Sequence, residues 1–120
     1  MKKILMIEDN EDFRLIVCEF LRLNNFQLIC AENGLIGLNI AKDQQPDLIL
    51  SDINMPELNG YEVLEGLRNN IYTATIPFIF ITSEEDEAYR CRALQLGANG
   101  YLIKPVDINE FLDAITTHLT

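Results

Sequence analysis

Short apolar runs alternate with longer amphipathic segments along this chain. Near-continuous apolar runs are typical of strands in a parallel sheet that helices cover on both faces. Between the runs, apolar residues recur at helical spacing, most clearly in 13–21 and 108–119, and less clearly in 35–43, 61–69 and 87–96. The predicted strands are Ile4–Ile7, Leu28–Ala31, Leu48–Leu50, Phe78–Ile81 and Tyr101–Ile103. The pattern predicts five strand–helix units.

Residues typical of helix ends lie where the predicted helices begin or end. Gly97 suits the left-handed residue that closes the fourth helix, and Asp107 with Glu110 resembles a capping box at the start of the fifth. Crossovers between parallel strands are right-handed. We therefore predict an α/β fold: a doubly wound, flavodoxin-like, five-stranded parallel sheet in the order 2-1-3-4-5, with helices on both faces. With no visible linker, residues 1–120 are predicted to form one domain.

Four apolar runs end at residues that can do chemistry: Asp9, Asp52, Thr82 and Lys104. The carboxyl ends of parallel strands lie along one edge of the sheet, which is where open α/β sheets bind ligands. The neighbouring carboxylates Glu8 and Asp9 would repel each other unless a cation lay between them. With Asp52 they would form an all-oxygen, anionic pocket of the kind that Mg²⁺ prefers.

Each residue also has a purely structural interpretation. The acidic run 8–12 could be a solvated segment that favours the positive end of the first helix. Asp52 could cap a turn, and Thr82 with Ser83 could cap the helix that starts near Glu84. Lys104, between an apolar run and a proline, could form a simple ion pair with Asp52 or Asp9. These alternatives stay open at the level of single residues.

The composition of the chain argues against several classes of binding partner and location. The formal net charge of −10, with no Lys/Arg cluster, argues against direct binding to nucleic acid or to an anionic membrane. No segment is long and apolar enough to span a bilayer, so we expect a cytoplasmic protein. Cys18, Cys30 and Cys91 are odd in number, widely spaced and embedded in apolar pattern. We predict buried free thiols in a reducing compartment.

Several blocks of sequence carry a family resemblance. They are Glu8-Asp9, the segment 51–56 with Gly60, the segment 81–83, and the segment 97–105 that ends in Lys104-Pro105. In this order and on these strands, they resemble the receiver domain of two-component response regulators, of the stand-alone, chemotaxis-regulator-like kind. The resemblance covers essentially the whole chain.

The resemblance implies a phosphorylation-dependent signalling switch. Asp52 would accept a phosphoryl group from a phosphohistidine on a sensor histidine kinase or a histidine phosphotransfer protein. Mg²⁺, or Mn²⁺ in its place, would be held by Asp9, Asp52 and the backbone carbonyl of Asn54, with Glu8 acting largely through water. Lys104 would take one phosphoryl oxygen. The protein would support its own phosphorylation and dephosphorylation without being an enzyme in the ordinary sense.

The resemblance also implies how the signal is passed on. The Thr82 hydroxyl would take a phosphoryl oxygen and move inward, and Tyr101 would follow into the space, altering the face formed by the fourth helix, fifth strand and fifth helix. A tyrosine with its hydroxyl in solvent is the alternative for Tyr101. Asn54 and Glu84 would modulate dephosphorylation. The family suggests a cis peptide at Lys104-Pro105, whereas the residues alone leave cis or trans open. The output partner is unknown, and the protein would be a monomer or a phosphorylation-dependent dimer.

Two other classes of protein share part of this pattern. An Mg²⁺-dependent aspartyl-phosphate phosphatase of the dehalogenase type also uses Asp, Thr/Ser, Lys and an acidic pair. In that phosphatase, however, the nucleophilic Asp ends the first strand, and an acid two residues later protonates the leaving group. Here the residue two positions after Asp52 is Asn54, which cannot act as an acid. A flavodoxin-like electron carrier would have the fold and the acidity. Here the acidic segment 9–12 would repel the flavin phosphate.

Overall fold

The computed structural model describes residues 1–119, so Thr120, the last residue of the predicted domain, lies outside the described residues. Strands and helices alternate along the chain as predicted. The strands are β1 (Lys3–Ile7), β2 (Gln27–Ala31), β3 (Leu48–Ser51), β4 (Phe78–Thr82) and β5 (Gly100–Ile103). The helices are α1 (Glu11–Leu23), α2 (Gly34–Gln44), α3 (Gly60–Arg68), α4 (Glu87–Gln95) and α5 (Ile108–Leu119).

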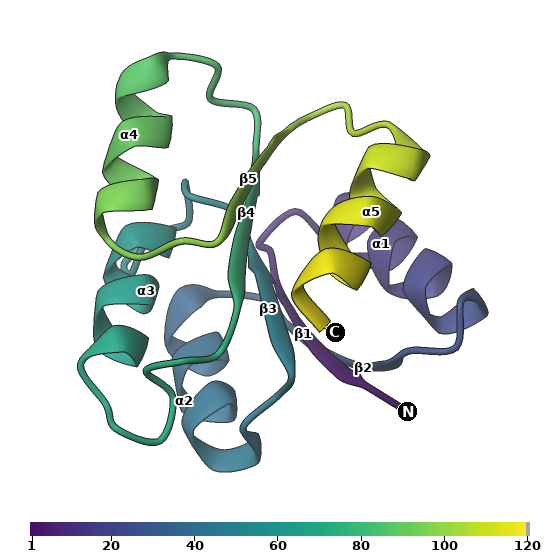
Figure 1. Cartoon of the computed structure of the whole chain (residues 1–120), viewed down its shortest axis with the longest axis horizontal. Helices are drawn as coiled ribbons and strands as arrows, with labels where there is room; N and C mark the ends of the chain where they lie inside the picture. The colour runs from purple at the N-terminus through teal and green to yellow at the C-terminus, as the bar shows by residue number, and fades with distance from the viewer. Residues whose placement is uncertain (120) are drawn as a thin grey trace.

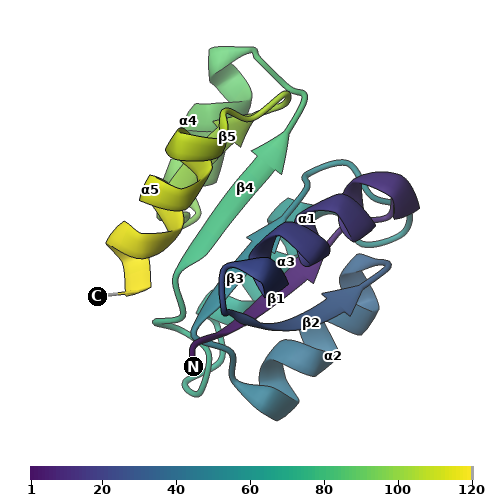
Figure 2. The same cartoon turned by 90° about the vertical axis from the view of Figure 1, so that its right-hand side faces the viewer.

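All neighbouring strands pair in parallel, in the order β2-β1-β3-β4-β5. The helices α1 and α5 cover one face of the sheet, while α2, α3 and α4 cover the other (Figure 1). Turned by 90°, the strands run in a common direction between the two helical layers (Figure 2). The predicted doubly wound, flavodoxin-like fold and its strand order are confirmed.

The apolar runs are buried because each central strand packs on both helical layers. Successive side chains of a strand point to opposite faces. In β1, Leu5 and Ile7 therefore join the core against α2, α3 and α4, while Ile4 and Met6 join the core against α1 and α5. All four are 0% exposed, and burying such a side chain stabilises a fold by about 1.5–3 kcal/mol. This is why β1, β3 and β4 show no polar alternation.

Short polar side chains begin the helices. Asn10, Asn33, Asn59 and Asp86 are the N-caps of the first four helices, and Asn59 forms a full capping box with Glu62. At the start of α5, Asp107 accepts a hydrogen bond from the Glu110 amide at 3.1 Å, which is one half of the box that the sequence predicts. Gly97 has φ +103°, the left-handed conformation expected after α4.

The prediction of three buried free thiols is wrong. Cys18 and Cys30 are joined by a disulfide, and Cys91 is free but exposed. The apolar pattern placed Cys18 correctly in the core, but it could not show that Cys30 comes opposite it on the edge strand β2. Cys91 lies on α4, of which only Ala93 is buried, so the surrounding apolar pattern was misleading.

Two further expectations concern the backbone and the membrane. The Lys104-Pro105 peptide is cis, as the family resemblance implied. Over residues 1–119, no helix is both long and apolar enough to cross a membrane.

Candidate functional site

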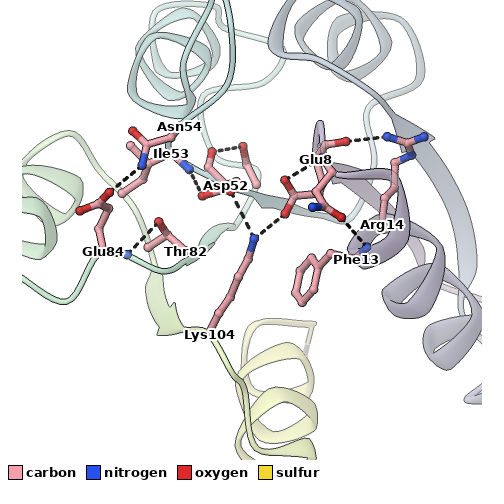
Figure 3. A network of polar contacts seen from close by, with 11 residues as sticks. Glu8, Phe13, Arg14, Asp52, Ile53, Asn54, Thr82, Glu84 and Lys104 are labelled. Carbon is pink, nitrogen blue, oxygen red and sulfur yellow. Dashed lines mark hydrogen bonds and ion pairs between the residues drawn. The ribbon is translucent and has the colours of Figure 1, made fainter.

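The strand ends bring the predicted chemical residues to one edge of the sheet. Glu8 directly follows β1, Asp52 follows β3, Thr82 ends β4 and Lys104 follows β5. The Asp52 amide donates to the Ile7 carbonyl at 3.2 Å, and the Lys104 amide donates to the Thr82 carbonyl at 2.8 Å. These continuations of the parallel ladder fix where each side chain emerges. Figure 3 shows Glu8, Asp52 and Lys104 pointing toward one another.

Three carboxylates form the acidic part of the site. One oxygen from each of Glu8, Asp9 and Asp52 lies within 4.8 Å of the others. Glu8 is 0% exposed and Asp52 only 9%, whereas Asp9 faces solvent. Burial raises the pKa of Glu8 above its usual value, and the nearby charge of Asp52 raises it further, against the opposing effect of Lys104. The cluster therefore holds more negative charge than its surroundings readily support, which favours a cation.

Lys104 supplies a positive charge to this cluster. Its Nζ lies 2.7 Å from Glu8 Oε1 and 3.3 Å from Asp52 Oδ2. Burial lowers the pKa of Lys104, but the hydrogen bond to Glu8 and the charges of Glu8 and Asp52 outweigh it, so the pKa lies above its usual value. The ring of Phe13 lies 4.2 Å from the same ammonium group. The sequence offered Asp52 or Asp9 as an ion-pair partner of Lys104. Asp52 is a partner in the structure, Asp9 is not, and the second partner is Glu8.

The loop after β3 holds the Asp52 carboxylate in position. The Ile53 amide donates to Asp52 Oδ1 at 2.7 Å, and the Gly60 amide donates to the Ile53 carbonyl at 2.8 Å. A Cβ at Gly60 would lie 2.2 Å from the Asp52 carbonyl oxygen. Glycine is therefore required for α3 to start this close to Asp52. Because Asp52 Oδ1 is bonded within this loop, Oδ2 is the oxygen that faces Lys104.

Thr82 does not cap α4. The N-cap is Asp86, whose side chain accepts from the Ala88 amide at 3.0 Å. Thr82 is 0% exposed, and its hydroxyl oxygen accepts from the Glu84 amide at 3.3 Å. The capping interpretation of Thr82-Ser83 is therefore wrong. In this bond the Thr82 hydroxyl oxygen is the acceptor, so the hydroxyl proton takes no part in it.

Glu84 connects three parts of the site. Its amide donates to Thr82, its carbonyl accepts from the Tyr101 hydroxyl at 2.8 Å, and its carboxylate accepts from the Asn54 amide group at 2.8 Å. The loop between β4 and α4 is thus linked to both the loop after β3 and the strand β5. Figure 3 shows the contacts of Glu84 with Thr82 and Asn54 beside Asp52.

Tyr101 is turned into the protein. It is 9% exposed, and its ring lies 6.3 Å from that of Phe80. Burial raises the pKa of Tyr101 to about 12. The alternative of a hydroxyl left in solvent is wrong, because the hydroxyl is bonded to the Glu84 carbonyl.

The sequence reasoning missed the contribution of α1. Arg14 donates to the Glu8 carbonyl at 2.8 Å, and the Asn10 amide donates to Glu8 Oε2 at 3.3 Å. Phe13, interpreted only as a core residue, contacts Lys104. Their positions could have indicated this role, because these residues lie in the N-cap and first turns of the helix that directly follows the acidic pair.

Comparison with known proteins identifies the family. The response regulator receiver domain family matches residues 4–116. The chain belongs to this family, and so to two-component signalling, where receiver domains act as switches. The match favours a receiver over both the aspartyl-phosphate phosphatase and the flavodoxin-like carrier.

Relatives of similar length support this. Protein PilH of Pseudomonas aeruginosa is 34% identical over 119 residues, covering 99% of this chain and 98% of PilH. The polar-differentiation response regulator DivK of Brucella anthropi is 31% identical, covering 98% of this chain and 96% of DivK. Other relatives are longer. The chain spans only 8% of histidine kinase P4 of Formosa agariphila and 51% of the probable transcriptional regulator ycf29 of Pyropia yezoensis.

Solved structures give the same fold. The chemotaxis response regulator CheY4 of Vibrio cholerae superimposes with a TM-score of 0.92 at 27% identity, covering 99% of both chains. The receiver domain of the sensor histidine kinase PA1611 of P. aeruginosa, solved with a magnesium ion coordinated in its active site cleft, gives 0.91 at 27% identity, covering 98% of this chain and 97% of that one.

Proposed function

We propose that the chain is a single receiver domain over 1–120 in which Asp52 accepts a phosphoryl group from a phosphohistidine donor. The observation that carries this proposal is the meeting of Asp52 with Lys104 and two further carboxylates at one sheet edge. The Asp52 carboxylate would attack phosphorus as the phosphorus–nitrogen bond breaks, and the imidazole would leave. In phosphoryl transfer the protein mainly positions groups and neutralises charge.

The donor set suits Mg²⁺ or Mn²⁺. Both are hard cations that prefer oxygen ligands, and oxygens of Glu8, Asp9 and Asp52 converge within 4.8 Å. We assign direct ligation to Asp9, Asp52 and the Asn54 carbonyl, with Glu8 acting through water. A metal ion at this position would neutralise charge on the transferred group. The magnesium ion in the PA1611 receiver domain supports this choice.

Four further side chains would act on the phosphoryl group or on the water that attacks it. Lys104, already 3.3 Å from Asp52, would bind one phosphoryl oxygen. The buried Thr82 hydroxyl would donate to another while still accepting from the Glu84 amide. Asn54 and Glu84, which are hydrogen-bonded to each other, would control how water reaches the acyl phosphate. Autodephosphorylation is therefore part of the proposal, without turnover of a separate substrate.

The signal would leave through Tyr101. A phosphoryl group adds roughly one negative charge to Asp52, and a Thr82 hydroxyl engaged with it would hold the Glu84 loop close. The inward Tyr101 seen here, bonded to the Glu84 carbonyl, is the position that we assign to the phosphorylated protein. The readout would be the surface of α4, β5 and α5, which a downstream protein would recognise.

The partners follow from the same chemistry. A sensor histidine kinase or a histidine phosphotransfer protein would supply the phosphoryl group, in the cytoplasm. The net charge of −10 disfavours direct contact with nucleic acid or an anionic membrane. The protein would act as a monomer or as a phosphorylation-dependent dimer.

Incubation with acetyl phosphate and Mg²⁺ tests the chemistry without a kinase. Intact mass should show one added phosphoryl group, which removal of Mg²⁺ by chelation prevents. Asp52→Asn should gain none, while Asp107→Asn, outside the cluster, should behave as the unmodified protein. Equal labelling of Asp52→Asn would overturn the assignment.

A further inference from the structure

A covalent bond ties α1 to the edge of the sheet. Cys18 lies on the inner side of α1 and is 4% exposed, packed into the core that α1 and α5 share. Its disulfide partner, Cys30, lies on the edge strand β2 and is exposed. The bond thus joins a buried residue of α1 to a solvent-exposed residue of the edge strand.

The helix that this bond holds is also a wall of the acidic cluster. Arg14 donates to the Glu8 carbonyl and Phe13 contacts the Lys104 ammonium group, both from the N-terminal half of α1. Cys18 follows Arg14 by about one helical turn. Anything that fixes or frees α1 at Cys18 therefore acts on the element that supports Glu8 and Lys104.

Contacts other than the disulfide also hold Cys18 and Cys30 in place. β2 is already held by its parallel ladder with β1, in which Met6 pairs with Cys30, and Cys18 is buried in its own right. The two Cα atoms are 7.2 Å apart, just beyond the range of about 4.4–6.8 Å that most disulfides span. The bond thus adds a covalent link between two elements that the fold already places side by side.

We propose that Cys18 and Cys30 form a reversible thiol–disulfide site that locks α1 onto β2. A dithiol reductant opens it: one thiolate attacks the Cys30 sulfur, the sulfur–sulfur bond breaks, and Cys18 leaves as a thiolate that takes up a proton. The second thiol of the reductant then attacks the mixed disulfide and releases Cys30 as a thiol. Two electrons pass to the protein, and the reductant leaves as a disulfide.

A low-molecular-weight disulfide such as oxidised glutathione closes the bond by the reverse exchange. Inside reducing compartments, disulfides are usually transient and redox-sensing. Whether the bond opens and closes in the cell thus rests on the cytoplasmic location in the proposed function. The bond itself and its effect on α1 do not depend on that location.

Thiol counting tests the bond directly. In a Cys91→Ser background, which removes the free exposed thiol, protein treated with oxidised glutathione and then alkylated under denaturing conditions should carry no adduct. Protein treated with dithiothreitol should carry two. Two alkyl groups or glutathione adducts after oxidation, or a disulfide between two chains, would overturn the proposal.

Hydrogen–deuterium exchange tests the lock. Reduction should speed exchange of the α1 amides about tenfold or more, because the link no longer limits local opening, while β3 and β4 stay protected. It should also lower Tm by about 10 °C. Cys30→Ser in the same background should match the reduced protein and ignore dithiothreitol. Unchanged α1 exchange on reduction would refute the lock even if the bond forms.

These measurements use no phosphoryl group. Failure of Asp52 to accept one would leave them standing, and failure of the lock would leave the Asp52 assignment untouched.

Discussion

Replacing Lys104 by methionine removes the positive charge of the site while keeping most of the side-chain stem against Phe13. At an effective dielectric constant of about 20, contacts of 2.7 and 3.3 Å to Glu8 and Asp52 correspond to gross attractions of about 6 and about 5 kcal/mol. Desolvation of the three charges offsets most of this. Breaking a buried ion pair from one side typically costs about 3–5 kcal/mol.

The expected net loss is smaller, because the Lys104 side chain keeps 21% of its exposure. We predict that Lys104→Met lowers the free energy of unfolding by about 2–3 kcal/mol at pH 7. With an unfolding entropy of about 2.1 cal/mol/K per residue, this corresponds to a Tm lower by about 10 °C. Lys104→Arg, which keeps the charge, should lose less than half as much.

The loss of stability in Lys104→Met should depend on pH, because it changes the pKa of Glu8. Without Lys104, the pKa of Glu8 rises further, because burial and Asp52 still raise it and the group that lowered it is gone. A folded-state pKa above the unfolded value means that the folded protein binds the proton more tightly, so stability falls as pH rises from about 4.5 through the folded pKa. The deficit of Lys104→Met should therefore be largest near pH 7 and shrink toward pH 4.5.

Thermal unfolding followed by circular dichroism between pH 4.5 and 7.5 measures these quantities. If Mg²⁺ binds the carboxylates, it should restore at least as much stability to Lys104→Met as to the unmodified protein, because it supplies the missing positive charge. A variant as stable as the unmodified protein at pH 7, or a deficit that grows toward pH 4.5, would refute the electrostatic account.

Three further substitutions test other parts of the account. Gly60→Ala places a Cβ 2.2 Å from the Asp52 carbonyl and should cost about 3 kcal/mol in urea unfolding; an unchanged midpoint would contradict the close approach. Tyr101→Phe loses the bond to the Glu84 carbonyl and should cost about 1 kcal/mol, with faster exchange of the loop before α4. Arg68→Met removes bonds to the backbone carbonyls of Ile76, which precedes β4, and Gly97, which follows α4. It should cost about 2–3 kcal/mol, and equal exchange of amides 97–100 would count against this.

The fold was predictable because burial on both faces leaves a direct mark on the sequence. The central strands read as unbroken apolar runs, and the strand ends then located the candidate site without any knowledge of side-chain positions. α4 was one of the three less clear helical patterns for a physical reason: only Ala93 of this helix is buried, so its sequence carries little apolar periodicity.

Pairings between distant side chains were not predictable. The partner of Lys104 depends on which of two adjacent carboxylates turns inward, and Glu8 does so while Asp9 faces solvent. The bonds of Glu84 to Asn54 and Tyr101 join residues 30 and 17 positions apart, a distance at which no local sequence pattern indicates a pairing. The Cys18–Cys30 bond was missed because spacing alone does not show that two cysteines face each other.

Locating the phosphoryl group on the chain tests whether Asp52 is the acceptor. After reaction with acetyl phosphate and Mg²⁺, borohydride reduces an aspartyl phosphate to homoserine, and peptide mapping by mass spectrometry identifies the modified residue. We expect homoserine at position 52 and nowhere else. Modification at Asp9 or another residue, or none under conditions where the intact mass shows a phosphoryl group, would contradict it.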